Sequence, residues 1–473
     1  MKLKTSYFNM SVLKKDITRF APLWGLYTVF MLLFLLLLQD TSPAGFASGA
    51  DDIMIGMGIL NMSYAWLAAS VLFSDLFKAR LCGALHAMPV RREGWFFAHV
   101  TAGMLFCLIP NALGAVLSAS ILGQYAYLAY IWLGLMLLEY ICFFGIACFS
   151  IQCAGSGFGA CAVYVIINFL PLLLIWLAKS FYEPVLFGVT VRSEALSRFS
   201  PVVGFTSHHY VDVKYVMATA VFNGFDADGW RYLLFAALAG LALMTAAVFM
   251  YRKRHLESAG DMIAFRPAAP VFLVLYALCV GAALYIFASV IESDLETFFL
   301  LTGLAIGWLT GQMLLEKRLK VFRPRILIGF GIFVFIFYLS VTLVWLDPFG
   351  ITRYVPQPEQ VKQVQVSPYT SDYYYNRTSA VVTDPAQVEK LTQIHRDLSR
   401  KRGENPDNMV LRLRYTLKNG RQVERTYYLD SSSEYGQWLK TVYSSPETVL
   451  GSGDLNALKQ SIRFAEVYKY NEK

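Results

Sequence analysis

The sequence is poor in charged residues. Only 16% of its 473 residues are Asp, Glu, Lys or Arg, whereas 56% are hydrophobic and the mean hydropathy is +0.47. A soluble globular chain carries about 25% charged residues, so we expect most of this chain to meet lipid rather than water. The net charge of +8 does not indicate a nucleic-acid partner, because the basic residues cluster in short segments between apolar runs, as they do in the cytoplasmic loops of membrane proteins.

Common catalytic motifs are absent as well. The chain contains no G-x-x-x-x-G-K-S/T, no H-E-x-x-H and no G-x-S-x-G, which are the usual signatures of ATP hydrolysis, zinc-dependent hydrolysis and acyl transfer. We therefore expect this chain not to be an enzyme and to bind no cofactor and no metal. The neighbouring His208 and His209 could suggest a metal site, but adjacent side chains point different ways on a helix or a strand. No cysteine follows Cys279, so the C-terminal region is not a disulfide scaffold.

Long apolar runs dominate what remains. A transmembrane helix needs about 20 mostly apolar residues, and we expect the first such run to remain in the protein as a helix rather than to be cleaved as a signal peptide. The sequence predicts a polytopic α-helical membrane protein with about nine transmembrane helices. The runs are approximately 22–39, 55–76, 96–122, 126–151, 156–178, 231–250, 269–291, 297–315 and 326–346.

The basic residues predict the orientation of these runs. They are concentrated before the first run and in segments 77–95, 251–268 and 316–325, which we therefore place in the cytoplasm together with the N-terminus. The uncharged break at 152–155 is the remaining cytoplasmic connection if cytoplasmic and exterior connections alternate. The number of transmembrane helices therefore depends on a single turn at Gly155–Gly159. An odd number of helices places residues 347–473 outside the cell.

Two segments are neither spans nor simple loops. Residues 1–21 contain an amphipathic helix that we expect to lie in the membrane interface; alternatively, they form a polar leader that only sets the orientation. Residues 179–230 form a long exterior connection, in which we expect short helices that re-enter the outer leaflet. The amphipathic helix, over 8–20, has Met10, Leu13, Ile17 and Phe20 on one face and Lys14, Lys15, Asp16 and Arg19 elsewhere.

The composition changes at Asp347-Pro348, after which we expect a small α+β domain over 347–473. Asn419-Gly420 lies between two alternating runs and predicts a β-hairpin. An exterior domain without cysteine is ordinary in bacteria that lack a strongly oxidising compartment, which favours a Gram-positive source. The expected elements are strands at 356–366, 410–417 and 423–429 and helices at 386–398, 433–443 and 455–468.

The predicted cytoplasmic segment 77–95 contains a short helix that is both apolar and basic. Leu81, Leu85 and Met88 fall on one face, and Pro89 would end the helix. Such a knob can seat in a groove of a partner protein and transmit force; alternatively, its basic residues only set the orientation and its apolar residues touch headgroups. The residues that we assign to coupling are Arg80, Leu81, Leu85, Met88, Pro89, Val90, Arg91 and Arg92.

The stretch from 78 to 93 resembles the cytoplasmic coupling segment of membrane permeases of the type-2 class of ABC exporters. In that family a basic stretch is followed by a short helix that ends in Leu-Pro-Val/Ile-x-Arg. Here Pro89, Val90 and Arg92 fit the pattern, and Met88 replaces the usual leucine.

The order of elements over residues 8–250 is also similar to that of the family: an interfacial helix, two spans, the coupling segment and four more spans. Residues 22–250 would be the six-span permease core, with 179–230 as its exterior re-entrant segment. The three further spans in 251–346 and the domain at 347–473 resemble an extended subset found in Gram-positive bacteria.

The resemblance implies a permease subunit in the plasma membrane that dimerises with itself or with a related permease. A separate ABC ATPase subunit would bind ATP and Mg, and the dimer would move a hydrophobic or amphipathic solute (a drug, a peptide or a lipid-like molecule) outward. The alternative function is a non-transporting membrane sensor or resistance component, whose exterior domain recognises a peptide or an envelope ligand.

Polar residues inside the apolar runs are further candidates for function. Glu139 lies near the centre of the predicted fourth span, where a carboxyl is costly and must face protein or a water-filled cavity. It would contact substrate or a proton, or switch between dimer arrangements. Alternatively, it is a protonated carboxyl that bonds a neighbouring helix through Asn61, Asn111 or Asn168.

Overall fold

The computed structural model describes residues 8–37, 43–87, 90–123, 126–189, 198–208, 210–216, 219–291, 295–370, 380–400 and 409–429. The chain divides into two compact units. The first unit contains Met1–Leu174 and Ser193–Phe333, and the second contains Ile175–Arg192 and Val334–Lys473. We call them the helical unit and the exterior unit, after their main content and their expected location.

Seven helices in the described part of the chain are long and apolar enough to cross a membrane. The prediction of a multi-pass helical membrane protein is therefore confirmed. Two shorter apolar helices, described over Ala21–Leu33 and Met57–Leu72, lie at the positions of the first two predicted spans. The nine apolar helices are α2 (Ala21–Leu37), α3 (Pro43–Leu72), α5 (Arg92–Leu122), α6 (Ala126–Cys153), α7 (Gly157–Leu177), α10 (Ala227–Lys253), α11 (Ala269–Val290), α12 (Glu296–Glu316) and α13 (Pro324–Leu346).

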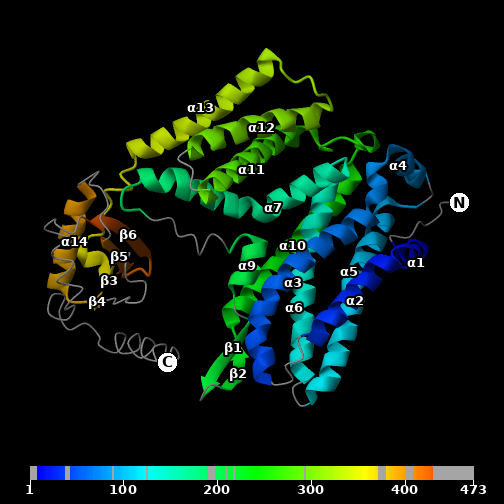
Figure 1. Ribbon diagram of the computed structural model, residues 1–473, viewed down its shortest axis with the longest axis horizontal. Coiled ribbons are helices and arrows are strands. Elements are labelled where there is room, and N and C mark those ends of the chain that lie inside the picture. The colour runs from blue at the N-terminus through cyan, green and yellow to red at the C-terminus, as the bar shows by residue number, and fades with distance from the viewer. Residues whose placement is uncertain are drawn as a thin grey trace. The chain divides into compact units, whose positions relative to one another are not determined.

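Helix α6 lies at the centre of the helical unit, against α3, α5 and α10 (Figure 1). Its contact with α10 is made by backbone, because Gly145 and Gly240 face each other. A Cβ on Gly145 would lie 2.1 Å from the Gly240 carbonyl oxygen. Large aromatic side chains fill the remaining space around α6: Tyr140, Phe143 and Phe144 are fully buried. Close backbone approach through small residues is the usual way in which membrane helices pack.

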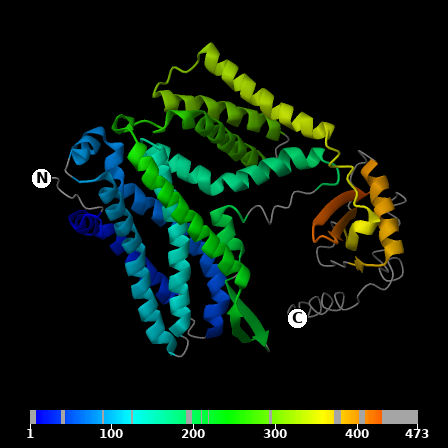
Figure 2. The same ribbon diagram turned by 180° about the vertical axis from the view of Figure 1, so that it is seen from behind.

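Helices α11 and α12 lie side by side in both views (Figures 1 and 2). Glycines spaced four residues apart on α12 make this contact. Gly303 and Gly307 face the backbone of Gly281 and Ala277, and Gly311 faces Leu273. The Trp308 ring of α12 stacks on the Phe333 ring of α13.

The segment after α7 combines short helices with a hairpin. A π-helical turn (Ala178–Tyr182) and a 3₁₀ turn (Glu183–Val185) belong to the exterior unit. In the helical unit, α9 (Pro201–Ser207) packs against α3, α6 and α10, and strands β1 (Val211–Val216) and β2 (Thr219–Phe225) pair beside α3. This hairpin was not predicted, although Val211, Val213 and Tyr215 alternate as they do in strands.

The exterior unit contains a four-stranded antiparallel sheet in the order β4-β3-β5-β6. Helix α14 covers one face and buries Val388 and Leu391 against residues such as Val364 and Leu413. The predicted helix and hairpin are present, and Gly420 in the hairpin turn has φ +80°; the short strand β4 was not predicted. The elements are β3 (Val361–Thr370), β4 (Ala380–Val382), α14 (Pro385–Arg400), β5 (Met409–Leu417) and β6 (Gln422–Leu429). The helices predicted at 433–443 and 455–468 lie outside the described residues.

Candidate functional site

The segments that we expected in the cytoplasm meet at one end of the helical unit. The Arg92 guanidinium Nη1 donates to the Arg252 and Arg254 carbonyls at 3.4 and 3.3 Å. Gly260 N–H donates to the Gly155 carbonyl at 2.7 Å, and the Lys317 ammonium pairs with Asp261. These contacts join segments 77–95, 152–155, 251–268 and 316–325, which we call the basic end.

The short helix predicted in segment 77–95 is present at the basic end as α4 (Ala79–His86), which lies near the end of α5 that is opposite the α5–α6 connection (Figure 1). Arg80 is exposed and Leu81 is 42% exposed, whereas Cys82 is buried in the helical core. Burial raises the pKa of the Cys82 thiol, so this side chain is a neutral anchor. The side chain of Leu85 and residues Met88 and Pro89 lie outside what the structure describes.

Two residues between α4 and the first turn of α5, Val90 and Arg92, contact the bundle. Val90 packs with Val12 and Trp95. Arg91 is the exposed N-cap of α5, and Arg92 donates to the backbone at the end of α10. The predicted coupling residues therefore divide into two groups. Arg80 and Leu81 are available to a partner, whereas Val90 and Arg92 attach the segment to the helical unit.

A buried arginine, which the sequence analysis did not single out, holds the basic end together. Arg254 is only 5% exposed, and it donates to the Ile151 carbonyl at 2.9 Å and to the Leu76 carbonyl at 3.3 Å. Ile151 belongs to α6 and Leu76 to the 3₁₀ turn Ser74–Phe77. Burial lowers the pKa of the Arg254 guanidinium, and carbonyls near helix C-termini, which carry partial negative charge, stabilise it. Sequence alone could not separate Arg254 from its exposed neighbours Arg252 and Lys253.

An ion pair reinforces the link between α5 and α10. The Arg252 guanidinium lies 2.8 Å from the Glu93 carboxylate. Glu93 is in the first turn of α5, directly after Arg92. Two consecutive residues at the start of α5 therefore bind the end of α10: Arg92 through hydrogen bonds and Glu93 through an ion pair.

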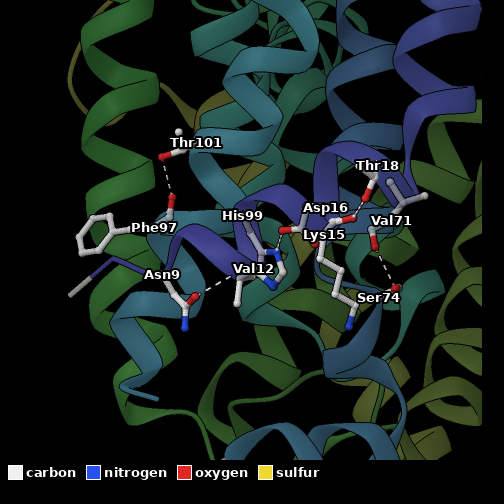
Figure 3. A network of polar contacts seen from close by, with 10 residues as sticks. All are labelled: Asn9, Val12, Lys15, Asp16, Thr18, Val71, Ser74, Phe97, His99 and Thr101. Atoms are coloured by element: carbon white, nitrogen blue, oxygen red, sulfur yellow. Dashed lines mark hydrogen bonds and ion pairs between the residues drawn. The ribbon is translucent and has the colours of Figure 1, made fainter. Parts of the chain in front are cut away.

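Helix α1 (Met10–Arg19) packs against the start of α5 through a buried polar pair (Figure 3). The Asp16 carboxylate of α1 lies 2.7 Å from Nδ1 of His99 on α5, and the two side chains are 6% and 9% exposed. The predicted helix is present, and Leu13, Ile17 and Phe20 of its predicted apolar face pack in the helical core. Met10 of that face is 57% exposed, whereas Asp16, which was placed elsewhere, is buried. Asp16 is buried because it finds a partner in His99, which a helical wheel cannot reveal.

Glu139 in α6 takes part in a hydrogen-bond network that joins four helices. The Asn61 amide Nδ2 of α3 donates to the Glu139 carboxyl at 2.8 Å. The Tyr27 hydroxyl of α2 donates to Asn61 Oδ1 at 3.1 Å, and the Asn111 amide of α5 donates to the Tyr27 hydroxyl at 3.4 Å. Asn168 is apart from this network, and its amide donates to the Tyr164 carbonyl of its own helix. The structure therefore brings two of the three intramembrane candidates together.

Among the described residues, no group of three or more His, Cys, Asp or Glu side chains is placed to hold a metal ion. His208 stacks on Tyr232 and its Nδ1 contacts the Gly204 carbonyl. No family model, no curated protein and no solved structure matches the chain. The residues and contacts of the basic end and of the Glu139 network are therefore what indicates a function.

Proposed function

We propose that this chain is the membrane permease subunit of an ATP-driven exporter of the type-2 ABC class. It pairs with itself or with a related permease and binds a separate ATPase subunit that carries ATP and Mg. In the plasma membrane of a Gram-positive bacterium it moves a hydrophobic or amphipathic solute outward, and residues 347–473 lie outside the cell. The observation that carries this proposal is α4, whose outer side is exposed while its flanks are attached to the bundle.

The outer side of α4 offers a partner protein an apolar group next to a cation. Leu81 is 42% exposed, and the neighbouring Arg80 is also exposed. An apolar side chain gains by entering a pocket, and a nearby charge orients the partner. Cys82 fixes the inner side of the same helix in the core, so a partner that moves α4 also moves the bundle.

The contacts around α4 provide a route for such a movement. Arg92 is bonded to the carbonyls at the end of α10, and Arg254 bonds α6 and the turn that precedes α4. Charge-assisted hydrogen bonds are stronger and more directional than apolar contacts. ATP-driven closure of the ATPase would therefore shift α6 and α10, which are in backbone contact at Gly145 and Gly240.

The test is copurification of the full chain with ATPases encoded beside it. Leu81→Asp places a charge in the docking surface, and we expect it to reduce the recovered ATPase at least about tenfold, which corresponds to about 1.4 kcal/mol. Phe349→Asp is the control, because Phe349 is 87% exposed and belongs to the exterior unit. Undiminished ATPase recovery with Leu81→Asp would refute the assignment of α4.

A second variant separates docking from force transmission. Arg92→Gln leaves the outer side of α4 unchanged and weakens the bonds to the end of α10. We expect normal ATPase recovery but a lower rate of solute export per ATP hydrolysed. Loss of ATPase recovery with this variant would instead make Arg92 part of the docking surface.

The alternative function, a membrane sensor, is favoured by a specific contact of the exterior unit. Thr426 N–H on β6 donates to the Gly188 carbonyl at 3.0 Å, and the Phe187 ring packs on Tyr427. Residues 187 and 188 follow α7, so a ligand on the sheet has a route to a membrane helix. Deleting residues 355–473 discriminates the two functions: a sensor loses signalling while export continues, whereas a pump component loses export.

A further inference from the structure

The loop between α12 and α13 exposes two large apolar side chains outside any helix. Leu319 is 82% exposed and Phe322 is 70% exposed. Both helices are apolar enough to cross a membrane, and only residues 317–323 connect them. A connection this short cannot leave the membrane surface, because seven extended residues span at most about 25 Å. Leu319 and Phe322 therefore lie at the level of the lipid headgroups.

The loop holds this arrangement through its central residue. Val321 is fully buried in a cluster with Trp308 and Ile326. Backbone bonds on either side fix the turn, because Val321 N–H donates to the Leu319 carbonyl and Arg323 N–H donates to the Val321 carbonyl. With Val321 directed inward, its neighbours on both sides are directed outward.

Three exposed cations surround the two apolar side chains. Arg318, Lys320 and Arg325 are exposed, and no carboxylate in the described part of the chain pairs with them. Their two basic neighbours are neutralised: Lys317 pairs with Asp261, and Arg323 lies 3.6 Å from Glu316. The loop thus combines unpaired positive charge with apolar groups that can enter the acyl boundary, as interfacial lipid-binding segments do.

We propose that residues 318–325 form a binding surface for anionic phospholipid headgroups at the basic end. The cations contact the phosphates, and Leu319 and Phe322 insert between the neighbouring acyl chains. This inference depends only on the membrane location of α12 and α13, so it stands or falls independently of the proposed transport function.

The test uses the purified full-length protein, with phosphatidylglycerol or phosphatidylcholine added to the detergent solution. Native mass spectrometry measures bound lipid, and the thermal unfolding midpoint measures stabilisation. We expect the wild-type protein to retain phosphatidylglycerol in preference to phosphatidylcholine. Removing three surface cations by Arg318→Gln, Lys320→Gln and Arg325→Gln is expected to weaken phosphatidylglycerol binding on the order of 100-fold, since each contributes about fivefold.

A matched control removes the same charge elsewhere. Lys362→Gln, Lys390→Gln and Arg396→Gln change three exposed cations of the exterior unit, and we expect wild-type binding. The paired variant Leu319→Ser and Phe322→Ser keeps every charge of the loop and is expected to lose at least about tenfold in affinity. All variants should keep the lipid-free unfolding midpoint, because the altered side chains are exposed.

Two outcomes would overturn the proposal. The first is unchanged phosphatidylglycerol binding in the loop triple variant; if the same variant also loses ATPase recovery, the surface belongs to a protein partner. The second is an equal loss in the control.

Discussion

Two buried arginines, one in each unit, make similar contacts. Arg254 of the helical unit is 5% exposed and Arg425 of the exterior unit is 7% exposed, and both donate to backbone carbonyls, Arg254 to two and Arg425 to three. The carbonyl partners of Arg254 belong to two elements far apart in the sequence. Those of Arg425 are Ile351 and Tyr354, in one short segment that follows α13, and its own neighbour Glu424 on β6.

This difference indicates different mechanical roles. Arg254 fastens the end of α10 to α6 and to the turn that precedes α4, so it makes one rigid body of the basic end. Arg425 attaches one segment, which contains Ile351 and Tyr354, to β6. Burial lowers the pKa of both guanidinium groups, yet both remain charged, because arginine ionises far above neutral pH. Each charge is stabilised by carbonyl dipoles, and its loss leaves those carbonyls without a donor.

The largest effect is expected from Arg254→Gln. The variant loses two charge-assisted hydrogen bonds, each of which contributes about 1.5–3 kcal/mol. We expect a loss of about 3–5 kcal/mol in unfolding free energy, with faster hydrogen exchange at the ends of both α6 and α10. Unfolding in detergent and hydrogen exchange measure these changes. Lys253→Gln is the control, since Lys253 is exposed and carries the same charge. Faster exchange at one helix end alone would contradict the bridging role.

Arg425→Gln is expected to have a smaller and more local effect. Of its two bonds to the segment after α13, one is good, at 2.9 Å to Ile351, and the other is long, at 3.4 Å to Tyr354; its third bond, at 3.1 Å to Glu424, stays within β6. We expect a loss of about 2–3 kcal/mol that is confined to the exterior unit, with faster proteolysis between residues 347 and 361. The helical unit should exchange hydrogen at the wild-type rate. Arg421→Gln, in the exposed hairpin turn, is the control and should leave the rate of proteolysis unchanged. If Arg425→Gln were cleaved no faster than this control, Arg425 would not attach the segment after α13.

Sequence reasoning found the elements that depend on local pattern. The apolar helices, α14 and the hairpin at Asn419-Gly420 follow from periodicity and turn chemistry, which act over a few residues. The short helix in segment 77–95 was predicted for the same reason. The four-residue spacing of the glycines at 303, 307 and 311 is a similar local pattern, from which no packing was predicted.

The contacts that define the candidate site could not be read in this way. Asp16 was assigned to the polar face of its helix, but its partner His99 is 83 residues away. Arg254 differs from Arg252 and Lys253 only in what the fold brings to it. Burial of an isolated charge is normally prohibitive, so a sequence-based analysis places such residues in water unless tertiary structure supplies their partners.

Acid is expected to weaken the exterior unit through His395. This side chain is fully buried beside Tyr415 and near Arg425, and burial lowers its pKa to about 3. Below the ordinary value of 6.5, the unfolded chain binds a proton that the folded domain does not, so stability falls as pH drops from about 6.5 toward 3. At pH 5 the loss is about 2 kcal/mol. Hydrogen exchange of β5 as a function of pH measures this loss.

Removing the titration of His395 separates the effect of pH on the exterior unit from the effect of losing Arg425. His395→Gln can still bond the Tyr415 hydroxyl, but it cannot bind a proton in this range. Its protection factors in β5, which are exchange rates relative to those of the unfolded chain at the same pH, should therefore be independent of pH between 5 and 7, whereas His255→Gln, an exposed site in the helical unit, should retain the wild-type dependence. A persistent acid effect in His395→Gln would point to other groups in the exterior unit.

The smallest effect is expected from Arg252→Gln, next to Arg254. The Arg252 side chain is 46% exposed and its partner Glu93 is 19% exposed, so solvent screens their attraction. Surface ion pairs contribute about 0–1 kcal/mol, and we expect a change in unfolding free energy within that range that diminishes as salt is raised. A loss as large as that of Arg254→Gln would mean that the α5–α10 link depends on the exposed ion pair rather than on the buried guanidinium. The basic end would then be held by salt-sensitive surface electrostatics rather than by buried hydrogen bonds.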